Sequence, residues 1–279
     1  MRWGNWGARY TTTQYSKLIA SCIENGLYTF DHADIYGNYT TERDFGWALQ
    51  STGIHRDSFQ LISKCGIELP GGEAAFSLKA YNYSEDYIVK SVENSLRNLQ
   101  TDFLDVFLLH RPSPLLDPEV VASAFNRLRE EGKVLHFGVS NFSVSQVDLL
   151  ASYVPNLLTN QIELSVNHLD CFYDGTLDQM MMRKMIPTAW SVMGNYFTEP
   201  STEQNFRLKQ TFAQLNQKYE ATEAQLMLAF ILKHPANIIP IIGSTKESNI
   251  VSAKEALKLN LERRDWFLIL EAIQGKEVP

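Results

Sequence analysis

The chain has 279 residues, a formal net charge of -7, 44% hydrophobic residues and 20% charged residues. This balance is typical of a folded globular protein, and the acidic excess argues against a binder of nucleic-acid phosphates, which needs concentrated lysine and arginine. The longest apolar run, 226–232, is too short to span a bilayer, and no apolar signal core follows the N-terminal arginine. The three cysteines match no zinc or redox spacing, so we expect a cytoplasmic protein with reduced thiols.

Apolar, strand-like runs alternate with helix-like patterns along nearly the whole chain. The predicted strands are 27–30, 59–63, 104–109, 134–139, 157–162, 188–192 and 237–242. A helical pattern at 13–25 precedes the first strand, and Ser84 and Pro118 suit the starts of two later helices. Most strand-like runs lack polar alternation, which is typical of strands covered on both faces. This alternation of strands and helices indicates parallel strands joined by right-handed crossovers.

Two architectures fit this pattern, a doubly wound sheet and a closed (β/α)8 TIM barrel. A doubly wound sheet that binds dinucleotides normally carries G-x-G-x-x-G after an early strand, and the chain has no such motif. No linker or shift of composition divides the sequence, so we favour a single barrel domain over residues 1–279. Only residues 1–3 remain for a strand ahead of the first helical pattern. The first barrel strand is therefore expected to be truncated or reduced to a stub.

Polar or aromatic residues stand where each predicted strand ends. In a barrel of this kind, chemistry takes place at the carboxyl ends of the strands. Each residue alone has a structural explanation, such as a cap, a solvated strand end or a packed histidine. Together they predict one site, formed by Asp31-His32, Lys64, His110-Arg111, Ser140-Asn141, the segment 161–163, Trp190-Ser191 and Gly243-Ser244.

An ordered series of motifs accompanies these positions. It reads D-H-A-D-I-Y-G, S-K-C-G, L-L-H-R-P, H-F-G-V-S-N-F, N-Q-I-E, A-W-S and P-I-I-G-S. In order and approximate spacing the series resembles the aldo-keto reductase superfamily over residues 1–279, and D-H-A-D-I-Y-G resembles its bacterial oxidoreductase branch. The resemblance implies a barrel enzyme that reduces small aldehydes or ketones to alcohols with a nicotinamide cofactor. It implies no nucleic-acid or membrane partner, and a monomer or weak homo-oligomer.

The resemblance assigns the catalytic roles to four residues, Asp31, Tyr36, Lys64 and His110. A free tyrosine titrates at about pH 10, and a neighbouring ammonium group is expected to lower the pKa of Tyr36. Asp31 would hold Lys64 in an ion pair. His110 would bind and polarise the substrate carbonyl, so that the developing alkoxide meets two donors.

The hydride must come from a cofactor, because no side chain can supply one. The resemblance implies NADP(H), or NAD(H), and predicts a set of binding residues in four groups. The carboxamide would be bound by Ser140, Asn141 and Gln161, the nicotinamide ring by Trp190, the pyrophosphate by Ser191, Met193 and Gly194, and the adenosine 2′-phosphate by Gly243, Ser244, Thr245, Lys246 and Asn249. Asn249 and Ala253 stand where many family members have arginine and asparagine, so the choice between NADPH and NADH stays open.

The segment 66–83, which includes Phe76, Tyr81 and Tyr83, is expected to close the pocket. One alternative function is a nicotinamide-binding barrel that acts as a redox sensor or partner-binding protein with little turnover. Another is a metal-dependent hydrolase that uses Asp31, His32, Asp34 and His110. Lys64 argues against the hydrolase, because its ammonium group would stand where the cation should bind.

Overall fold

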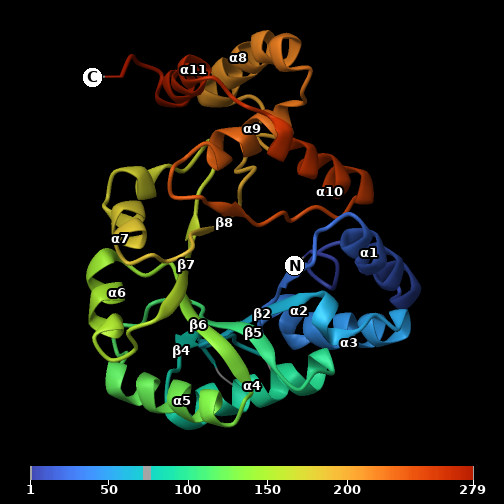
Figure 1. Cartoon of the computed structure of the whole chain (residues 1–279), viewed down its shortest axis with the longest axis vertical. Helices are drawn as coiled ribbons and strands as arrows, with labels where there is room; N and C mark the ends of the chain where they lie inside the picture. Colours follow the sequence, from blue (N-terminus) through green and yellow to red (C-terminus); the bar gives the residue numbers. More distant parts are fainter. Residues whose placement is uncertain (1, 72–76, 279) are drawn as a thin grey trace. The chain divides into compact units, whose positions relative to one another are not determined.

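The computed structural model of the chain describes residues 2–71 and 77–278. These residues fall into two compact units. Figure 1 shows the helices and strands of the chain. The first unit comprises Met1–Asn160 and Gly243–Glu247, and the second comprises Gln161–Ile242 and Ser248–Pro279. Phe76, which the sequence predicted to help close the pocket, lies outside the described residues.

Parallel strands form the centre of the first unit. They are β1 (Thr29–Asp31), β2 (Gln60–Cys65), β5 (Leu104–Leu109) and β6 (Val134–Ser140), followed in the sheet by the first residues of β7 (Leu157–Glu163). The register pairs Asp31 with Ile62 and Lys64 with Leu108. Most side chains of β2 and β5 are buried, which agrees with their lack of polar alternation. The predicted strands of this region are confirmed, with ends shifted by a few residues.

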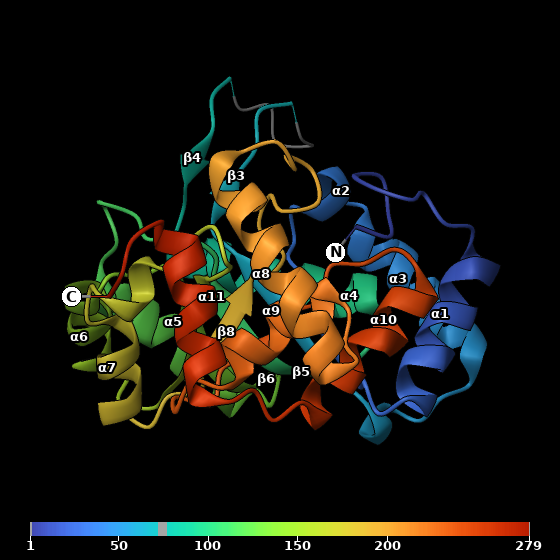
Figure 2. The same cartoon turned by 90° about the horizontal axis from the view of Figure 1, so that it is seen from above.

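Helices connect these strands. Helix α1 (Thr12–Glu24) packs on α3 (Thr41–Thr52), α3 on α4 (Glu85–Leu99), and α4 on α5 (Pro118–Glu130), while α6 (Val144–Ala151) follows β6. In helix α4, Ile88, Val92, Leu96 and Leu99 form a buried apolar stripe. Such a stripe at helical spacing holds a helix against its neighbours, because the apolar surface is removed from water. Figure 2 shows α1, α3, α4 and α5 from a second direction.

A polar anchor fixes β2 beside β5. The Asp105 carboxylate accepts hydrogen bonds from the Arg56 guanidinium at 2.6 Å and from the Leu61 backbone N–H at 2.8 Å. The same guanidinium lies 3.9 Å from the centre of the Phe103 ring. Because these groups are largely buried, the anchor helps to set the register of β2, which carries Lys64, and of β5, which His110 follows.

The hairpin that follows β2 consists of β3 (Ile67–Glu68) and β4 (Ala80–Tyr81), which pair antiparallel. Ahead of α1, residues 3–8 form bends and turns, and the described part of the chain has no strand before that helix. The short segment α2 (Tyr36–Tyr39) is not a regular helix, because Gly37 and Asn38 have left-handed backbone angles.

The second unit contains the last residues of β7 with β8 (Thr188–Trp190) and β9 (Ile239–Pro240), again in parallel pairs. Both later strands are shorter than predicted; β8 ends at Trp190, where Ser191 adopts a left-handed φ of 60°. The helices are α7 (Thr176–Met182), α8 (Glu203–Tyr219), α9 (Glu223–Leu232), α11 (Arg263–Gln274) and α10 (Glu247–Lys254), the last of which begins in the first unit.

Aromatic stacking organises the core of the second unit. The rings of Phe230 and Trp266 stack with centroids 4.8 Å apart, and the Trp266 indole donates a hydrogen bond to the Phe230 carbonyl at 2.9 Å. This contact joins α9 to α11. None of the helices in the described residues is both long and apolar enough to cross a membrane.

Candidate functional site

Lys64 is the centre of a buried polar cluster at the carboxyl end of β2. Its side chain is fully buried, and Nζ donates to both carboxylate oxygens of Asp31 at 2.8 Å and to the His32 carbonyl at 2.7 Å. The Tyr36 hydroxyl lies 3.4 Å from the same nitrogen. Burial alone would lower the pKa of Lys64, but the charges and hydrogen bonds of Asp31 and Tyr36 raise it above its ordinary value.

The chain turns sharply just after Tyr36, through three consecutive left-handed residues, Gly37, Asn38 and Tyr39. Glycine is required at the first of these positions, because a Cβ on Gly37 would lie 2.4 Å from the Thr41 hydroxyl oxygen. The Tyr36 ring also faces the Lys64 ammonium group, 5.1 Å from its centroid.

The pKa of Tyr36 differs from the sequence prediction. Burial raises it, and the positive charge of Lys64 opposes this effect without overcoming it, so the pKa lies above the ordinary tyrosine value. The predicted net lowering is therefore wrong in this structure, because desolvation of the phenolate outweighs its attraction to the lysine. Tyr36 consequently holds its proton at neutral pH.

His110 follows β5 directly and is nearly buried. Its backbone N–H donates to the Cys65 carbonyl at 2.9 Å, and its ring meets the Tyr36 ring edge-on with centroids 5.8 Å apart. Burial, together with the charges of Lys64 and Arg111, lowers the pKa of His110 to about 2. The imidazole is therefore neutral over the physiological pH range.

The structure thus brings the four predicted residues together at the carboxyl ends of β1, β2 and β5. His32 packs its ring on Phe45, with centroids 4.4 Å apart, and neither ring nitrogen has a hydrogen-bond partner in the described structure. Within residues 2–71 and 77–278, no group of three or more His, Cys, Asp or Glu side chains is arranged to hold a metal ion.

Within the first unit, the residues predicted to bind the cofactor lie at the end of β6 and ahead of α10. Asn141 has a left-handed φ of 58° and donates from its amide to the Ser140 hydroxyl at 2.7 Å. In the segment 243–246, the Ser244 hydroxyl accepts from the Lys246 backbone N–H at 3.1 Å.

Two aromatic residues that sequence reasoning missed hold the segment 243–246. The Trp3 indole donates to the Ser244 carbonyl at 2.8 Å, and the Tyr10 hydroxyl donates to the Thr245 carbonyl. The signal available in the sequence was the aromatic density of R-W-G-N-W-G-A-R-Y at the N-terminus. A third residue of this stretch, Trp6, lies against Tyr36 with ring centroids 6.0 Å apart.

Within the second unit, Gln161 is buried in β7 and Trp190 ends β8. Ser191 and Gly194 in the following loop both have left-handed backbone angles. Asn167, which sequence reasoning also missed, anchors this loop by accepting a hydrogen bond from the Asn195 backbone N–H at 2.9 Å. Of the other predicted residues, Met193 packs against the core of this unit and Asn249 is exposed on α10.

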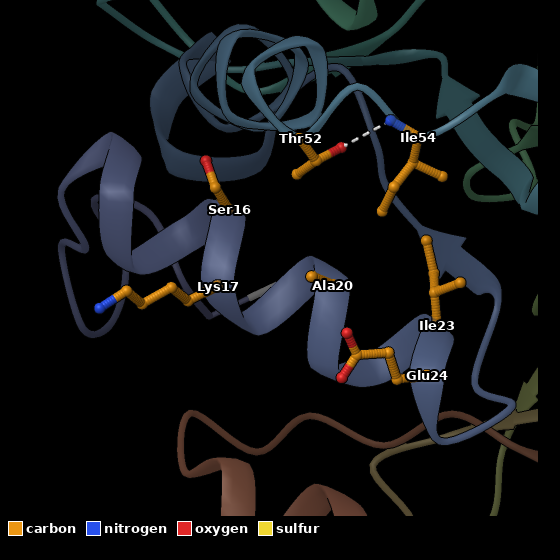
Figure 3. Close-up of a pocket in the computed structure, with 7 residues that line it drawn as sticks. All are labelled: Ser16, Lys17, Ala20, Ile23, Glu24, Thr52 and Ile54. Carbon is orange, nitrogen blue, oxygen red and sulfur yellow. Dashed lines mark hydrogen bonds between the residues drawn. The ribbon is translucent and has the colours of Figure 1, made fainter.

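A surface hollow of about 450 Å³ in the first unit is unrelated to these residues (Figure 3). It lies between α1 and the residues around the end of α3, and its lining consists of Ser16, Lys17, Ala20, Ile23, Glu24, Thr52 and Ile54. None of the predicted site residues lines it. A second hollow, of about 320 Å³, borders the loop after Tyr36 and the residues that follow β3.

Comparison with known proteins places the chain in a family. The model of the "Aldo/keto reductase family" matches residues 1–274. The chain is 44% identical to uncharacterized oxidoreductase YcsN of Bacillus subtilis, over 97% of this chain and 91% of that protein. It is 37% identical to a 6-dehydroglucose reductase of Agrobacterium fabrum, over 93% and 88% of the two chains.

The fold is also that of solved structures. The thermostable aldo-keto reductase Tm1743 superposes with a TM-score of 0.82 at 23% identity, over 97% of this chain and 93% of that one. This likeness confirms the predicted fold class, the (β/α)8 barrel.

Proposed function

Because the chain belongs to the aldo/keto reductase family, we propose that it reduces small aldehydes or ketones to alcohols with a nicotinamide cofactor, and that Tyr36 supplies the proton. The observation that carries the proposal is the contact of Lys64 with both Asp31 and Tyr36, beside the neutral ring of His110. Proton transfer by a tyrosine requires a charged group beside its hydroxyl, such as this buried ion pair, whereas simple ligand binding does not.

Tyr36 is the proton donor in this mechanism. Reduction places negative charge on the carbonyl oxygen as the new carbon–hydrogen bond forms, and the phenol transfers its proton to that oxygen. The raised pKa keeps Tyr36 protonated before the reaction. Once the proton leaves, the ammonium group of Lys64 at 3.4 Å stabilises the resulting phenolate.

Asp31 and Lys64 act as one unit. The carboxylate keeps Lys64 charged in a site that would otherwise favour the neutral amine, and its two equal contacts hold the ammonium group in place. The His32 carbonyl accepts a third hydrogen bond, which fixes the remaining direction of Nζ. Lys64 thus stays charged, and its nitrogen is held 3.4 Å from the Tyr36 hydroxyl.

His110 orients the substrate. Because its pKa is depressed to about 2, the ring is a neutral hydrogen-bond donor rather than a cation. A donor beside Tyr36 directs the carbonyl oxygen toward the phenol and shares the charge that develops there. Orientation of this kind lowers the barrier without any proton transfer by His110 itself.

The cofactor we propose is NADP(H), or NAD(H), which when bound supplies the hydride. The amide and hydroxyl groups of Ser140, Asn141 and Gln161 fit the nicotinamide carboxamide, and the aromatic face of Trp190 fits its ring. Ser191 and Gly194 have left-handed backbone angles in the loop after β8, and we propose that this loop binds the pyrophosphate. Lys246, at the start of α10, supports a preference for the 2′-phosphate of NADPH.

The substrate class is a small aldehyde or ketone, and the relatives named 6-dehydroglucose reductase favour including sugar-derived aldehydes. We propose a single barrel domain that acts as a monomer or weak homo-oligomer in the cytoplasm. The three buried thiols, Cys22, Cys65 and Cys171, support a reducing compartment.

The test is oxidation of NADPH and NADH, followed optically, with a panel of aromatic, aliphatic and sugar-derived aldehydes. Cofactor affinity is measured separately by titration of tryptophan fluorescence. We expect turnover with several aldehydes and tighter binding of NADPH. Tight cofactor binding without turnover across the panel would instead favour the alternative function, a nicotinamide-responsive sensor or partner-binding protein.

A further inference from the structure

We propose that Tyr83 is a positioning residue for His110, and that it acts by clamping the peptide of Arg111, the next residue in the chain. The inference deepens the proposed function and rests on it, because it concerns how one member of the site is held. The clamp comes from the segment 66–83, to which sequence reasoning gave only a covering role.

The ring of His110 lacks the usual orienting bond. An imidazole that binds a substrate through one nitrogen is commonly fixed by a hydrogen bond at the other. The Nδ1 of His110 is buried, and no described group of the protein is its partner. The direction of the ring therefore depends on its contact with Tyr36 and on how firmly the backbone at 110–111 is held.

The Tyr83 hydroxyl holds that backbone from both sides. It donates a hydrogen bond to the Arg111 carbonyl at 2.5 Å and accepts one from the Arg111 N–H at 3.1 Å. Tyr83 is nearly buried, and burial raises the pKa of its hydroxyl, so the group keeps the proton that it donates. One hydroxyl group thus holds both the backbone N–H and the backbone carbonyl of Arg111.

The ring of Tyr83 packs on Gly66, which comes two residues after Lys64 in the chain. The ring lies so close to Gly66 that a Cβ there would come within 2.0 Å of the ring carbon Cε1, and Gly66 has a φ of 108°. The Asn82 N–H donates to the Gly66 carbonyl at 3.0 Å, which fixes the base of the hairpin β3–β4. Tyr83 therefore ties the chain just after Lys64 to the chain just after His110.

The experiment is a double-mutant cycle between Tyr83→Phe and His110→Ala, read as single-turnover reduction rates and cofactor affinity. Tyr83→Phe keeps the ring on Gly66 and removes only the hydroxyl. We expect about a tenfold fall in rate with unchanged cofactor affinity. In the His110→Ala background, Tyr83→Phe should lower the single-turnover rate by less than about twofold, because the imidazole ring that it positions is absent.

The matched control is Tyr39→Phe. The Tyr39 hydroxyl also binds backbone on both sides, donating to the Ile67 carbonyl at 3.3 Å and accepting from the Leu69 N–H at 3.1 Å, but neither group adjoins His110. Tyr39→Phe should therefore change the single-turnover rate by the same factor in the wild-type and His110→Ala backgrounds. An equal loss from Tyr83→Phe in both backgrounds would overturn the inference.

A readout that needs no turnover separates this inference from the proposed function. The imidazole signals of His110 in a protein labelled with ¹⁵N-histidine should shift in Tyr83→Phe and stay in place in Tyr39→Phe. If the wild type reduces no carbonyl, the proposed function fails, and these signals still decide whether Tyr83 sets the ring of His110. Unchanged signals in Tyr83→Phe would contradict the clamp.

Discussion

The ammonium group of Lys64 is fully buried and lies 2.8 Å from both carboxylate oxygens of Asp31, whose side chain is only 14% exposed. A charge in such a place requires its partner, since an unpaired buried ion costs several kcal/mol. The ion pair therefore contributes to the stability of the fold and is also part of the proposed proton-transfer site. Mutations can separate these two roles.

Asp31→Asn should destabilise the protein by about 3 kcal/mol, because it leaves the Lys64 ammonium group without a counter-charge. The double variant Asp31→Asn with Lys64→Met removes both charges and should recover most of that loss in urea denaturation, while carbonyl reduction stays abolished. If Asp31→Asn cost no more than the ~0.5 kcal/mol typical of an exposed ion pair, the structural role of the pair would be refuted.

Tyr36→Phe should lower kcat for carbonyl reduction by about 10²–10⁴-fold, the usual contribution of a positioned acid. The dissociation constant for NADPH should change by less than about twofold, because the proposed binding residues are untouched. Tyr28→Phe, at an exposed tyrosine just before β1, serves as the control and should keep wild-type rates. A Tyr36→Phe enzyme with normal kcat would assign the proton to another donor.

The strand-end rule explains why most of the site could be predicted from the sequence. Asp31, Lys64 and His110 each stand at or just after the end of an apolar run, and parallel strands bring such ends together. Tyr36 lies in the loop beyond the end of β1, immediately before the left-handed turn that begins at Gly37, so its prediction needed the family resemblance. No periodic pattern encodes such a turn.

Contacts between distant residues could not be predicted. The bond from Trp3 to the Ser244 carbonyl spans 241 positions, and the clamp of Tyr83 on Arg111 joins two loops whose separation no local pattern encodes. The pKa of Tyr36 was also predicted in the wrong direction, because the sequence reveals the neighbouring lysine but not the depth of burial. These errors all concern how the folded chain excludes water and joins its loops.

The pH dependence of the two reaction directions should differ. Reduction needs protonated Tyr36, whose pKa is raised, so its single-turnover rate should stay level from about pH 6 to 9 and fall only at more alkaline pH. Alcohol oxidation needs the phenolate and should rise over the same range. Since the pKa of His110 is about 2, neither profile should break near pH 6.5. A break there that vanished in His110→Gln would show that the imidazole titrates.

His32→Leu should make stability less sensitive to acid. Burial lowers the pKa of His32 well below 6.5. Below pH 6.5 the unfolded chain therefore binds a proton at His32 that the folded chain does not bind, so the free energy of unfolding decreases as the pH is lowered. One such histidine contributes a slope of about 1.4 kcal/mol per pH unit between pH 6 and 5. Urea denaturation at several pH values should show His32→Leu losing that slope. His55→Leu, whose side chain is 80% exposed in the wild type, is the control and should retain it. Equal slopes in the two variants would mean that His32 is protonated in the folded state.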